Sequence, residues 1–296
     1  MTDQAPLLSS PSESAAPSDH FLIVNGRRHH YLEWGSAGEP ELVLLHGGSS
    51  SARGTWARMA PVFANSYRIV APDHRGHGET EWDPEAGYTI GNYVLDFEQV
   101  VYQLSLSSFD LVGHSLGGMI ALTYAARHPE RVRRLVLVDS GPRDFTAADA
   151  ARMRMPERPM SFATRDDAEA FARAGFPEAA RDRSVSYGFV QRSDGSWTWR
   201  TDVAGLQRAR TREDHLRASG LWSEFSAIRC PILILRGGRS PALSDETTRR
   251  IEAANPHARV ITYPEAHHWV HDDEPQRFLS DVAAFLAASQ GLSQSR

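Results

Sequence analysis

The sequence contains a single cysteine, Cys230, among its 296 residues. One thiol cannot form an internal disulfide, and no cysteine spacing typical of a metal site is present. Cys230 stands before Pro231 and the apolar residues ILIL. We therefore interpret it as a small buried side chain rather than as a reactive thiol.

Long apolar runs and a large charge excess are also missing. No stretch approaches the roughly 18 apolar residues of a membrane-spanning helix. Residues 1–20 lack the basic and apolar regions of a secretion signal and have the composition of a disordered tail. Lys and Arg total 32 against 37 Asp and Glu, so the net charge of −5 gives no reason to expect nucleic acid or a membrane as partner. These absences predict a cytoplasmic protein and leave its oligomeric state, a homo-oligomer included, open.

What the chain does contain is an alternation of apolar runs with helical stretches. Residues 21–34 predict a β-hairpin that turns at Asn25-Gly26. Six runs are typical of strands buried on both faces: 41–48, 67–73, 109–115, 133–141, 230–238 and 258–268. Helical stretches follow them at 51–64, 92–106, 116–128, 244–255 and 275–288. This pattern predicts an α/β fold with a mostly parallel eight-stranded sheet, helices on both faces, and a site at the carboxyl ends of the strands.

Residues 142–221 interrupt this alternation. They contain no run of buried-strand type and are rich in arginine. We interpret them as a mostly helical cap inserted into a core of residues 21–141 and 222–290, which follows the tail of residues 1–20. Aromatic and sulfur side chains in this segment and directly after it fit the wall of an apolar pocket and plain packing equally well: Met153, Met155, Met160, Trp197, Trp199 and Trp222.

A serine between glycines is the strongest functional signal. Residues 111–118 read LVGHSLGG, an apolar strand and a tight turn that precede a helical stretch. G-x-S-x-G in this setting is typical of a nucleophile elbow, where the turn strains Ser115 and the glycines prevent collisions. The helix beginning after Ser115 directs amides and the positive end of its dipole toward an anion beside the hydroxyl. The alternative is a glycine-rich turn without chemistry.

A serine that cleaves an ester needs a base and hydrogen-bond donors for the developing oxyanion. His268 follows the last predicted strand, at the same edge of the sheet as Ser115, and is the candidate base. The amide of Leu116, next to the nucleophile, is one candidate oxyanion donor. The amide of Gly48, in the HGG turn at 46–48, is the second.

Other histidines raise competing interpretations. His267 and His271 are four residues apart, but no third ligand and no HExxH motif accompanies them, so we expect neither a metal nor a cofactor. His74 and His77 in DHRGHG fit either substrate binding or a turn packed beside the elbow.

The segments LLHGG, APDHRGHGET, LVGHSLGGMIAL, RRLVLVDSGP, PILILRGG and AHHWVHDDEP occur in the order and spacing of the α/β-hydrolase superfamily. The chain resembles its capped branch, which includes epoxide hydrolases, meta-cleavage-product hydrolases, esterases and lactonases. The resemblance covers residues 21 to about 290. It implies the α/β-hydrolase fold, Ser115 as nucleophile and His268 as base. Haloalkane dehalogenases and epoxide hydrolases place an aspartate at the elbow, so Ser115 implies neither of those chemistries.

The triad acid departs from the superfamily pattern. That acid usually follows the seventh strand, where this chain has Ser240 or Pro241, and neither can be ionised. Asp139, at the end of the preceding strand, is the preferred candidate because some members take their acid from there. Asp245 is the rival, although Ser244 reads as a helix N-cap with Asp245 in the first helical turn. A Ser–His dyad, a water in the gap or an unidentified acid also remain open.

We therefore expect a cofactor-free serine hydrolase that forms an acyl-enzyme on Ser115. A carboxylic ester or lactone in a small, largely apolar molecule is the expected substrate. Cleavage of a carbon–carbon bond beside a ketone is the second expectation, because the capped branch includes such enzymes. A non-hydrolytic tailoring enzyme or a small-molecule receptor is the third, since this fold also hosts those roles.

Overall fold

An eight-stranded sheet runs through the computed structural model, which describes residues 16–48, 50–144, 158–175, 185–210 and 221–288. The strand order is β1-β2-β4-β3-β5-β6-β9-β10. The strands are β1 (Ser18–Val24), β2 (Arg27–Trp34), β3 (Glu41–Leu45), β4 (Arg68–Pro72), β5 (Phe109–His114), β6 (Val132–Val138), β9 (Ile232–Gly237) and β10 (Ala258–Tyr263). β2 is antiparallel to β1 and β4, and the other neighbouring pairs are parallel. The predicted mostly parallel eight-stranded sheet is confirmed.

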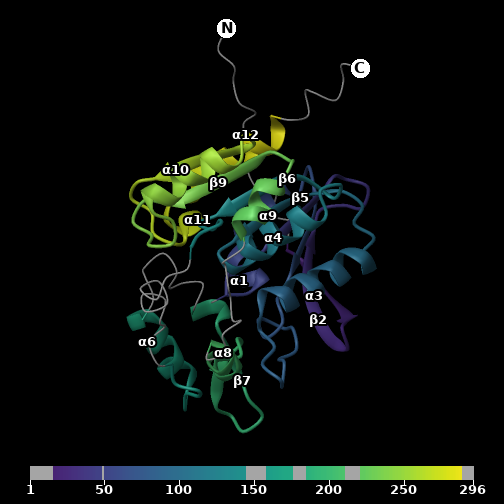
Figure 1. Cartoon of the computed structure of the whole chain (residues 1–296). Coiled ribbons are helices and arrows are strands. Elements are labelled where there is room, and N and C mark those ends of the chain that lie inside the picture. Colours follow the sequence, from purple (N-terminus) through teal and green to yellow (C-terminus); the bar gives the residue numbers. More distant parts are fainter. Residues whose placement is uncertain (1–15, 49, 145–157, 176–184, 211–220, 289–296) are drawn as a thin grey trace.

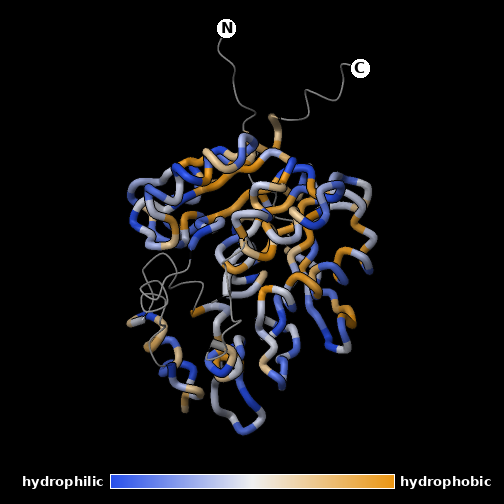
Figure 2. Tube along the Cα trace, in the orientation of Figure 1, coloured by the Kyte–Doolittle hydropathy of each residue, from blue (hydrophilic) through white to orange (hydrophobic). Residues whose placement is uncertain are grey.

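Neighbouring residues of a strand point to opposite faces of the sheet, so apolar side chains emerge on both faces. Helices cover both of these faces. Leu111 and Leu135 pack on the face of α3, α4 and α9, whereas Val112 and Val136 pack on the face of α1, α2 and α12. The apolar strands lie inside and the polar helix surfaces outside (Figure 2). The helices outside the inserted segment are α1 (Ala52–Trp56), α2 (Ala60–Phe63), α3 (Ile90–Gln103), α4 (Leu116–Arg127), α9 (Leu221–Ala227), α10 (Asp245–Ala254), α11 (Val270–Asp273) and α12 (Pro275–Ala287).

The segment inserted between β6 and α9 forms a separate body on the far side of the core from α12 (Figure 1). Its described elements are α6 (Arg165–Gly175), β7 (Phe189–Gln191), β8 (Trp197–Trp199) and α8 (Val203–Arg210). β7 and β8 pair as an antiparallel ribbon, a feature that the expectation of a mostly helical segment did not include. A small apolar cluster centred on Phe162, Phe189 and Trp199 holds these elements together.

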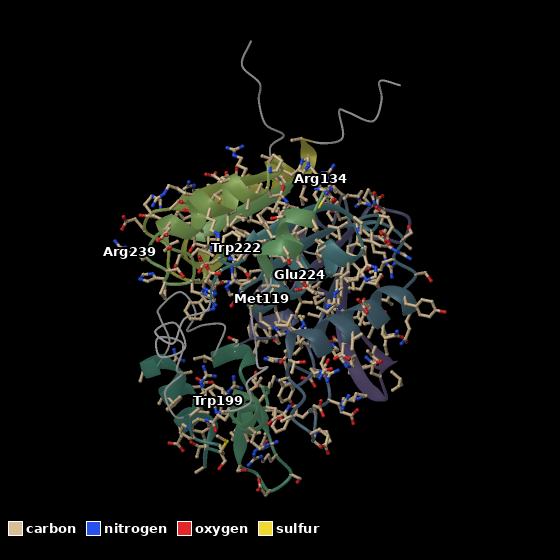
Figure 3. The ribbon with its side chains drawn as sticks, viewed as in Figure 1. Met119, Arg134, Trp199, Trp222, Glu224 and Arg239 are labelled. Atoms are coloured by element: carbon tan, nitrogen blue, oxygen red, sulfur yellow. The ribbon has the colours of Figure 1, made fainter. Side chains whose placement is uncertain are left out.

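The aromatic and sulfur side chains singled out in the sequence have different environments. Trp199 is 4% exposed inside the cluster of the inserted segment (Figure 3), whereas Met160 is 40% exposed. Trp222, on α9, donates its Nε1 proton to Asp144 and lies under the guanidinium group of Arg250. Met153 and Met155 lie outside the described residues.

Several boundaries differ from the expectations. The stretch 51–64 forms two short helices, with Pro61 in the first turn of α2, because proline cannot donate the hydrogen bond that a continuous helix needs. β1 begins at Ser18, inside the segment expected to be a tail, and residues 1–15 lie outside the described part.

Cys230 is partly buried, and burial raises the pKa of its thiol to about 12. Within the described ranges, no helix has the length and apolar character needed to cross a bilayer.

Candidate active site

Ser115 occupies the sharp turn between β5 and α4. Every residue of β5 is buried, and α4 begins directly after the serine, at Leu116. The Ser115 backbone has φ 52° and ψ −111°, in a region that residues other than glycine rarely adopt. Its N–H donates to the Val138 carbonyl at 3.1 Å, and its carbonyl accepts from Ser140 Oγ at 2.9 Å. These bonds tie the turn to the end of β6 and offset a backbone strain of about 1–3 kcal/mol.

The glycines around Ser115 are required by close approaches of the backbone. A Cβ atom on Gly113 would lie 2.4 Å from the carbonyl oxygen of Gly117. A Cβ atom on Gly117 would lie 2.3 Å from the carbonyl oxygen of Leu45. Both distances are too short for a real side chain, so glycine alone allows α4 to pack this closely against β3 and β5. The close packing holds Ser115 at the carboxyl end of β5.

The structure brings Ser115, His268 and Asp139 together. His268 lies in the loop between β10 and α11, and its Nε2 is 2.9 Å from Ser115 Oγ. Its Nδ1 is 2.6 Å from Asp139 Oδ2. Because a carboxylate accepts at Nδ1, we assign the ring proton to Nδ1, which leaves Nε2 to accept from the serine hydroxyl. In this tautomer the imidazole can take the proton of Ser115.

Asp139 stands one residue beyond β6, and its side chain is fully buried. Its own N–H donates to the Leu235 carbonyl at 2.7 Å, and its backbone has φ 45°. Oδ1 accepts from the Gly237 amide at 3.0 Å, and Oδ2 accepts from both His268 Nδ1 and Ser240 Oγ. A buried carboxylate needs such donors, because burial without them is very costly. The three bonds also direct the carboxylate at His268.

Asp245, the rival acid, lies at the start of α10. Its side chain is 76% exposed and pairs with Arg236 on β9. The predicted N-cap is confirmed, since Ser244 Oγ accepts from an amide in the first turn of α10. Asp139 makes the contact to His268 Nδ1, so the geometry favours Asp139 over Asp245 as the acid.

Gly48 and Leu116, the predicted oxyanion donors, lie beside each other. A Cβ atom on Gly48 would be 3.4 Å from Leu116 Cδ2, and one on Gly47 would be 3.5 Å from Ser115 Cβ. Leu116 is the first residue of α4, so its N–H has no acceptor within the helix. His46 Nδ1 donates to the Gly47 carbonyl at 2.8 Å. Since the C=O and N–H of a trans peptide point in opposite directions, the Gly48 N–H points away from His46.

Three buried histidines hold this loop in place. The His74 amide donates to His46 Nε2 at 3.0 Å, and His74 Nε2 donates to the His46 carbonyl at 2.9 Å. His77 contacts the carbonyls of Gly48 and Arg75. Burial lowers the pKa of His74 to about 3 and also lowers the pKa of His77, so both rings are neutral near pH 7. His74 and His77 therefore pack as a turn beside the elbow, one of the two roles that the sequence left open.

The sequence interpretation missed two polar contacts. His114, the last residue of β5, is 2% exposed, and its Nε2 donates to the His268 carbonyl at 2.9 Å. A polar side chain in a fully buried strand needs a partner, and this requirement was the available signal. Ser240 entered only as the position without an acid, whereas its hydroxyl donates to Asp139.

His267 and His271 have separate environments. His271 is fully buried, and its ring centroid lies 4.8 Å from that of His114. The His267 amide donates to Asp273 Oδ2 at 2.6 Å. In the part of the chain that the structure describes, no group of three or more His, Cys, Asp or Glu side chains is placed to hold a metal ion.

Several known proteins similar to this chain are named as hydrolases or esterases. A family model described as the alpha/beta hydrolase fold matches residues 40–275. The 3-hydroxybutyrate-oligomer hydrolase of Cupriavidus necator is 31% identical over 255 residues, which cover 81% of this chain and 87% of that protein. Esterase Rv0045c of Mycobacterium tuberculosis is 29% identical over 297 aligned residues, 96% of each chain.

Solved structures give the same picture. The crystal structure of E-2-(acetamidomethylene)succinate hydrolase has a TM-score of 0.78 and 25% identity, and covers 92% of this chain and 99% of its own. The crystal structure of esterase Rv0045c has a TM-score of 0.75 and 25% identity, and covers 92% of this chain and 91% of its own.

Proposed function

Because the chain belongs to the alpha/beta hydrolase fold family and is a hydrolase of the serine type, we propose that it cleaves a carboxylic ester or lactone through an acyl-enzyme on Ser115. One observation carries the proposal: His268 contacts Ser115 Oγ at 2.9 Å and Asp139 Oδ2 at 2.6 Å. An imidazole between a hydroxyl and a buried carboxylate is the arrangement that makes serine a nucleophile near pH 7. The proposed reaction uses no cofactor.

In the first half-reaction, Ser115 Oγ attacks the carbonyl carbon of the ester while its proton moves to His268 Nε2. The carbonyl oxygen becomes an oxyanion, which accepts hydrogen bonds from the Gly48 and Leu116 amides. Asp139 stabilises the imidazolium that forms and keeps Nδ1 as its donor. The bond to the leaving oxygen then breaks, and His268 Nε2 gives its proton to that oxygen. The acyl group stays on Ser115.

In the second half-reaction, water replaces the alcohol. His268 Nε2 takes a proton from the water, whose oxygen attacks the acyl carbon. The same two amides bind the second oxyanion. The bond to Ser115 Oγ then breaks, and the proton on Nε2 returns to that oxygen. The carboxylic acid leaves, and the enzyme regains its starting state.

The inserted segment, residues 142–221, serves as a cap in this proposal. Met119, in the first turn of α4, lies on the side of the core nearest to this segment (Figure 3). Tyr88 donates its hydroxyl proton to Asp202 Oδ2 at 2.6 Å, and the Asp202 amide donates to the Gly76 carbonyl at 2.8 Å. These buried bonds join the segment to the loop after β4, whose histidines support the oxyanion loop.

We propose a small, largely apolar ester or lactone as the substrate and the cytoplasm as the location. One relative is named an esterase and another a 3-hydroxybutyrate-oligomer hydrolase, and such names favour an ester as the bond cleaved. The near-neutral charge balance of the chain offers no attraction for a polyanionic substrate.

Steady-state kinetics with p-nitrophenyl acetate test the proposal. Ser115→Ala should lower kcat by about 10⁴ to 10⁶ while circular dichroism shows an intact fold. The adjacent histidines give a matched pair: His268→Ala should be nearly as damaging, and His267→Ala should cost little. Substantial turnover by folded Ser115→Ala protein would exclude the serine mechanism.

A further inference from the structure

The turn after β9 carries a hydroxyl where the superfamily usually places its acid. β9 ends at Gly237, and Ser240 follows in the turn, 7% exposed. Ser240 Oγ donates to Asp139 Oδ2, the oxygen that also accepts from His268 Nδ1 at 2.6 Å. Ser240 and His268 therefore share one carboxylate oxygen.

The Ser240 hydroxyl has a defined orientation. The Ala242 amide donates to Ser240 Oγ at 3.1 Å, so a lone pair of that oxygen is occupied. The Ser240 amide donates to the Gly237 carbonyl at 3.1 Å and closes the turn. With its oxygen engaged by an amide, the hydroxyl directs its own proton at Asp139.

Two arginines hold the backbone of this turn. Arg143 Nη1 donates to the Ala242 carbonyl at 2.9 Å, and Arg236 Nε donates to the Leu243 carbonyl at 2.8 Å. Arg143 follows β6, the strand that leads to Asp139, and Arg236 lies on the neighbouring strand β9. The turn is therefore fixed to both of these strand ends. Ser240 is thus held against the carboxylate by the surrounding backbone.

Asp139 is the charged side chain bonded to the His268 ring. Three other titratable or charged groups lie near the pair. The His114 ring on β5 lies 4.8 Å from the His268 ring between centroids and donates to the His268 carbonyl, while Arg236 on β9 pairs with Asp245 and His267 on the same loop pairs with Asp273. The charge that the His268 ring meets therefore depends mainly on Asp139 and on whatever donates to its carboxylate.

We propose that Ser240 is a positioning residue that acts on the reaction through Asp139, an inference that rests on the proposed Ser115 mechanism. Its hydroxyl fixes Oδ2 within reach of His268 Nδ1 and neutralises part of the carboxylate charge. The chain thus supplies the acid from β6 and keeps, at the usual acid position, a donor that holds it. Without the hydroxyl, Asp139 is less restrained, and its full charge acts on the imidazolium.

The pH dependence of p-nitrophenyl acetate hydrolysis tests this role. Ser240→Ala should lower kcat about tenfold, the rate equivalent of one hydrogen bond to a charged group, and leave KM within about twofold. The acidic limb of the kcat/KM profile should move to higher pH, because a carboxylate with one donor fewer favours the protonated imidazole more strongly. A merely structural residue would not move this limb.

Two control variants separate positioning from folding. Ser240→Thr keeps the hydroxyl and should keep the acidic limb in place. Ser244→Ala removes the N-cap of the nearby α10, so it should lower Tm while the limb stays unchanged. If Ser240→Ala does not fold, Ser240→Cys substitutes a weak donor of similar size and should show the same shift.

Two negative results are possible, and each contradicts a different proposal. A wild-type enzyme that a fluorophosphonate probe does not label would contradict the proposed function itself. A labelled wild-type enzyme, together with a Ser240→Ala variant whose kcat and acidic limb equal those of wild type, would contradict only the role of Ser240.

Discussion

His268 contacts both Ser115 and Asp139, and these contacts decide which of its nitrogens carries the proton. Nδ1 lies 2.6 Å from a buried carboxylate, and Nε2 lies 2.9 Å from a hydroxyl. An amide in place of the carboxylate could turn its NH₂ group toward Nδ1. The ring would then carry its proton on Nε2, where it cannot accept from Ser115.

Asp139→Asn should therefore lower kcat by about 10⁴ with little change in fold, because the imidazole takes the wrong tautomer. Asp245→Asn is the matched control, since Asp245 is exposed on α10 and should affect activity little. Both variants are measured by steady-state kinetics on p-nitrophenyl acetate. An Asp139→Asn enzyme as fast as wild type would show that the acid is elsewhere or that the site is a dyad.

Single residues differ in how far the sequence predicts them. Ser115 and His268 could be identified because each follows an apolar strand, and the glycines mark the turn at Ser115. Asp139 stayed one of several candidates, because its choice depends on which strand ends are neighbours in space. The contact between Ser240 and Asp139 spans 101 positions and depends on a distance that no sequence pattern contains.

At the level of helices and strands, elements with a strong apolar pattern could be predicted from the sequence, and very short elements could not. Five of the six runs expected to be buried form mostly buried strands of the sheet: β3, β4, β5, β6 and β9. The expectation that the sixth run, 258–268, is buried on both faces was wrong, because β10 is the edge strand and only its last residue, Tyr263, is buried. The ribbon of β7 and β8 has three residues in each strand and depends on the packing of Phe189 and Trp199 with Phe162. Such short pairs follow from tertiary contacts rather than from periodicity.

The hydrogen bonds that connect the loop after β4 to the inserted segment lead to a prediction at the level of helices, strands and loops. Tyr88 is fully buried, donates to Asp202 Oδ2 at 2.6 Å and accepts from the Asp83 amide at 2.9 Å. Burial, followed by the bond to Asp202, raises the pKa of Tyr88 far above its ordinary value, so the hydroxyl stays a donor. Tyr88→Phe keeps the ring and should lower the free energy of unfolding by about 1–3 kcal/mol.

Urea denaturation measures this loss. Tyr102→Phe is the matched control, because Tyr102 is 78% exposed on α3 and its hydroxyl lies at the surface. Equal unfolding midpoints for Tyr88→Phe and Tyr102→Phe would mean that the hydrogen bond between Tyr88 and Asp202 contributes nothing to stability.

For the molecule as a whole, buried neutral histidines make stability depend on pH. Burial lowers the pKa of His74 to about 3 and also lowers the pKa of His29 and His77. Between pH 3 and 6.5, the unfolded chain binds a proton at His74 that the folded protein does not bind. This contribution to stability is complete above pH 6.5 and is lost as the pH falls below it.

His30 contributes with the opposite sign. Burial opposes its protonation, but hydrogen bonds to Asp73 and Asp19 outweigh burial and raise the pKa of His30. Its stabilising effect is complete below pH 6.5 and is lost as the pH rises through the raised pKa. Three buried histidines have a lowered pKa, whereas only His30 of these four histidines has a raised one.

The free energy of unfolding should therefore be lower at pH 5 than at pH 7, by about 2 kcal/mol from His74 alone. Urea titrations at both values measure the difference. Equal or greater stability at pH 5 would contradict the account of the buried histidines.

Mass spectrometry after reaction with a fluorophosphonate probe tests the serine mechanism most directly. The probe mimics an acyl donor and stays bound to a serine that a neighbouring base activates. We predict one adduct per chain, located on the peptide that contains Ser115, and none on folded Ser115→Ala protein. A folded wild-type enzyme that stays unmodified, or an adduct on any residue other than Ser115, would contradict the mechanism.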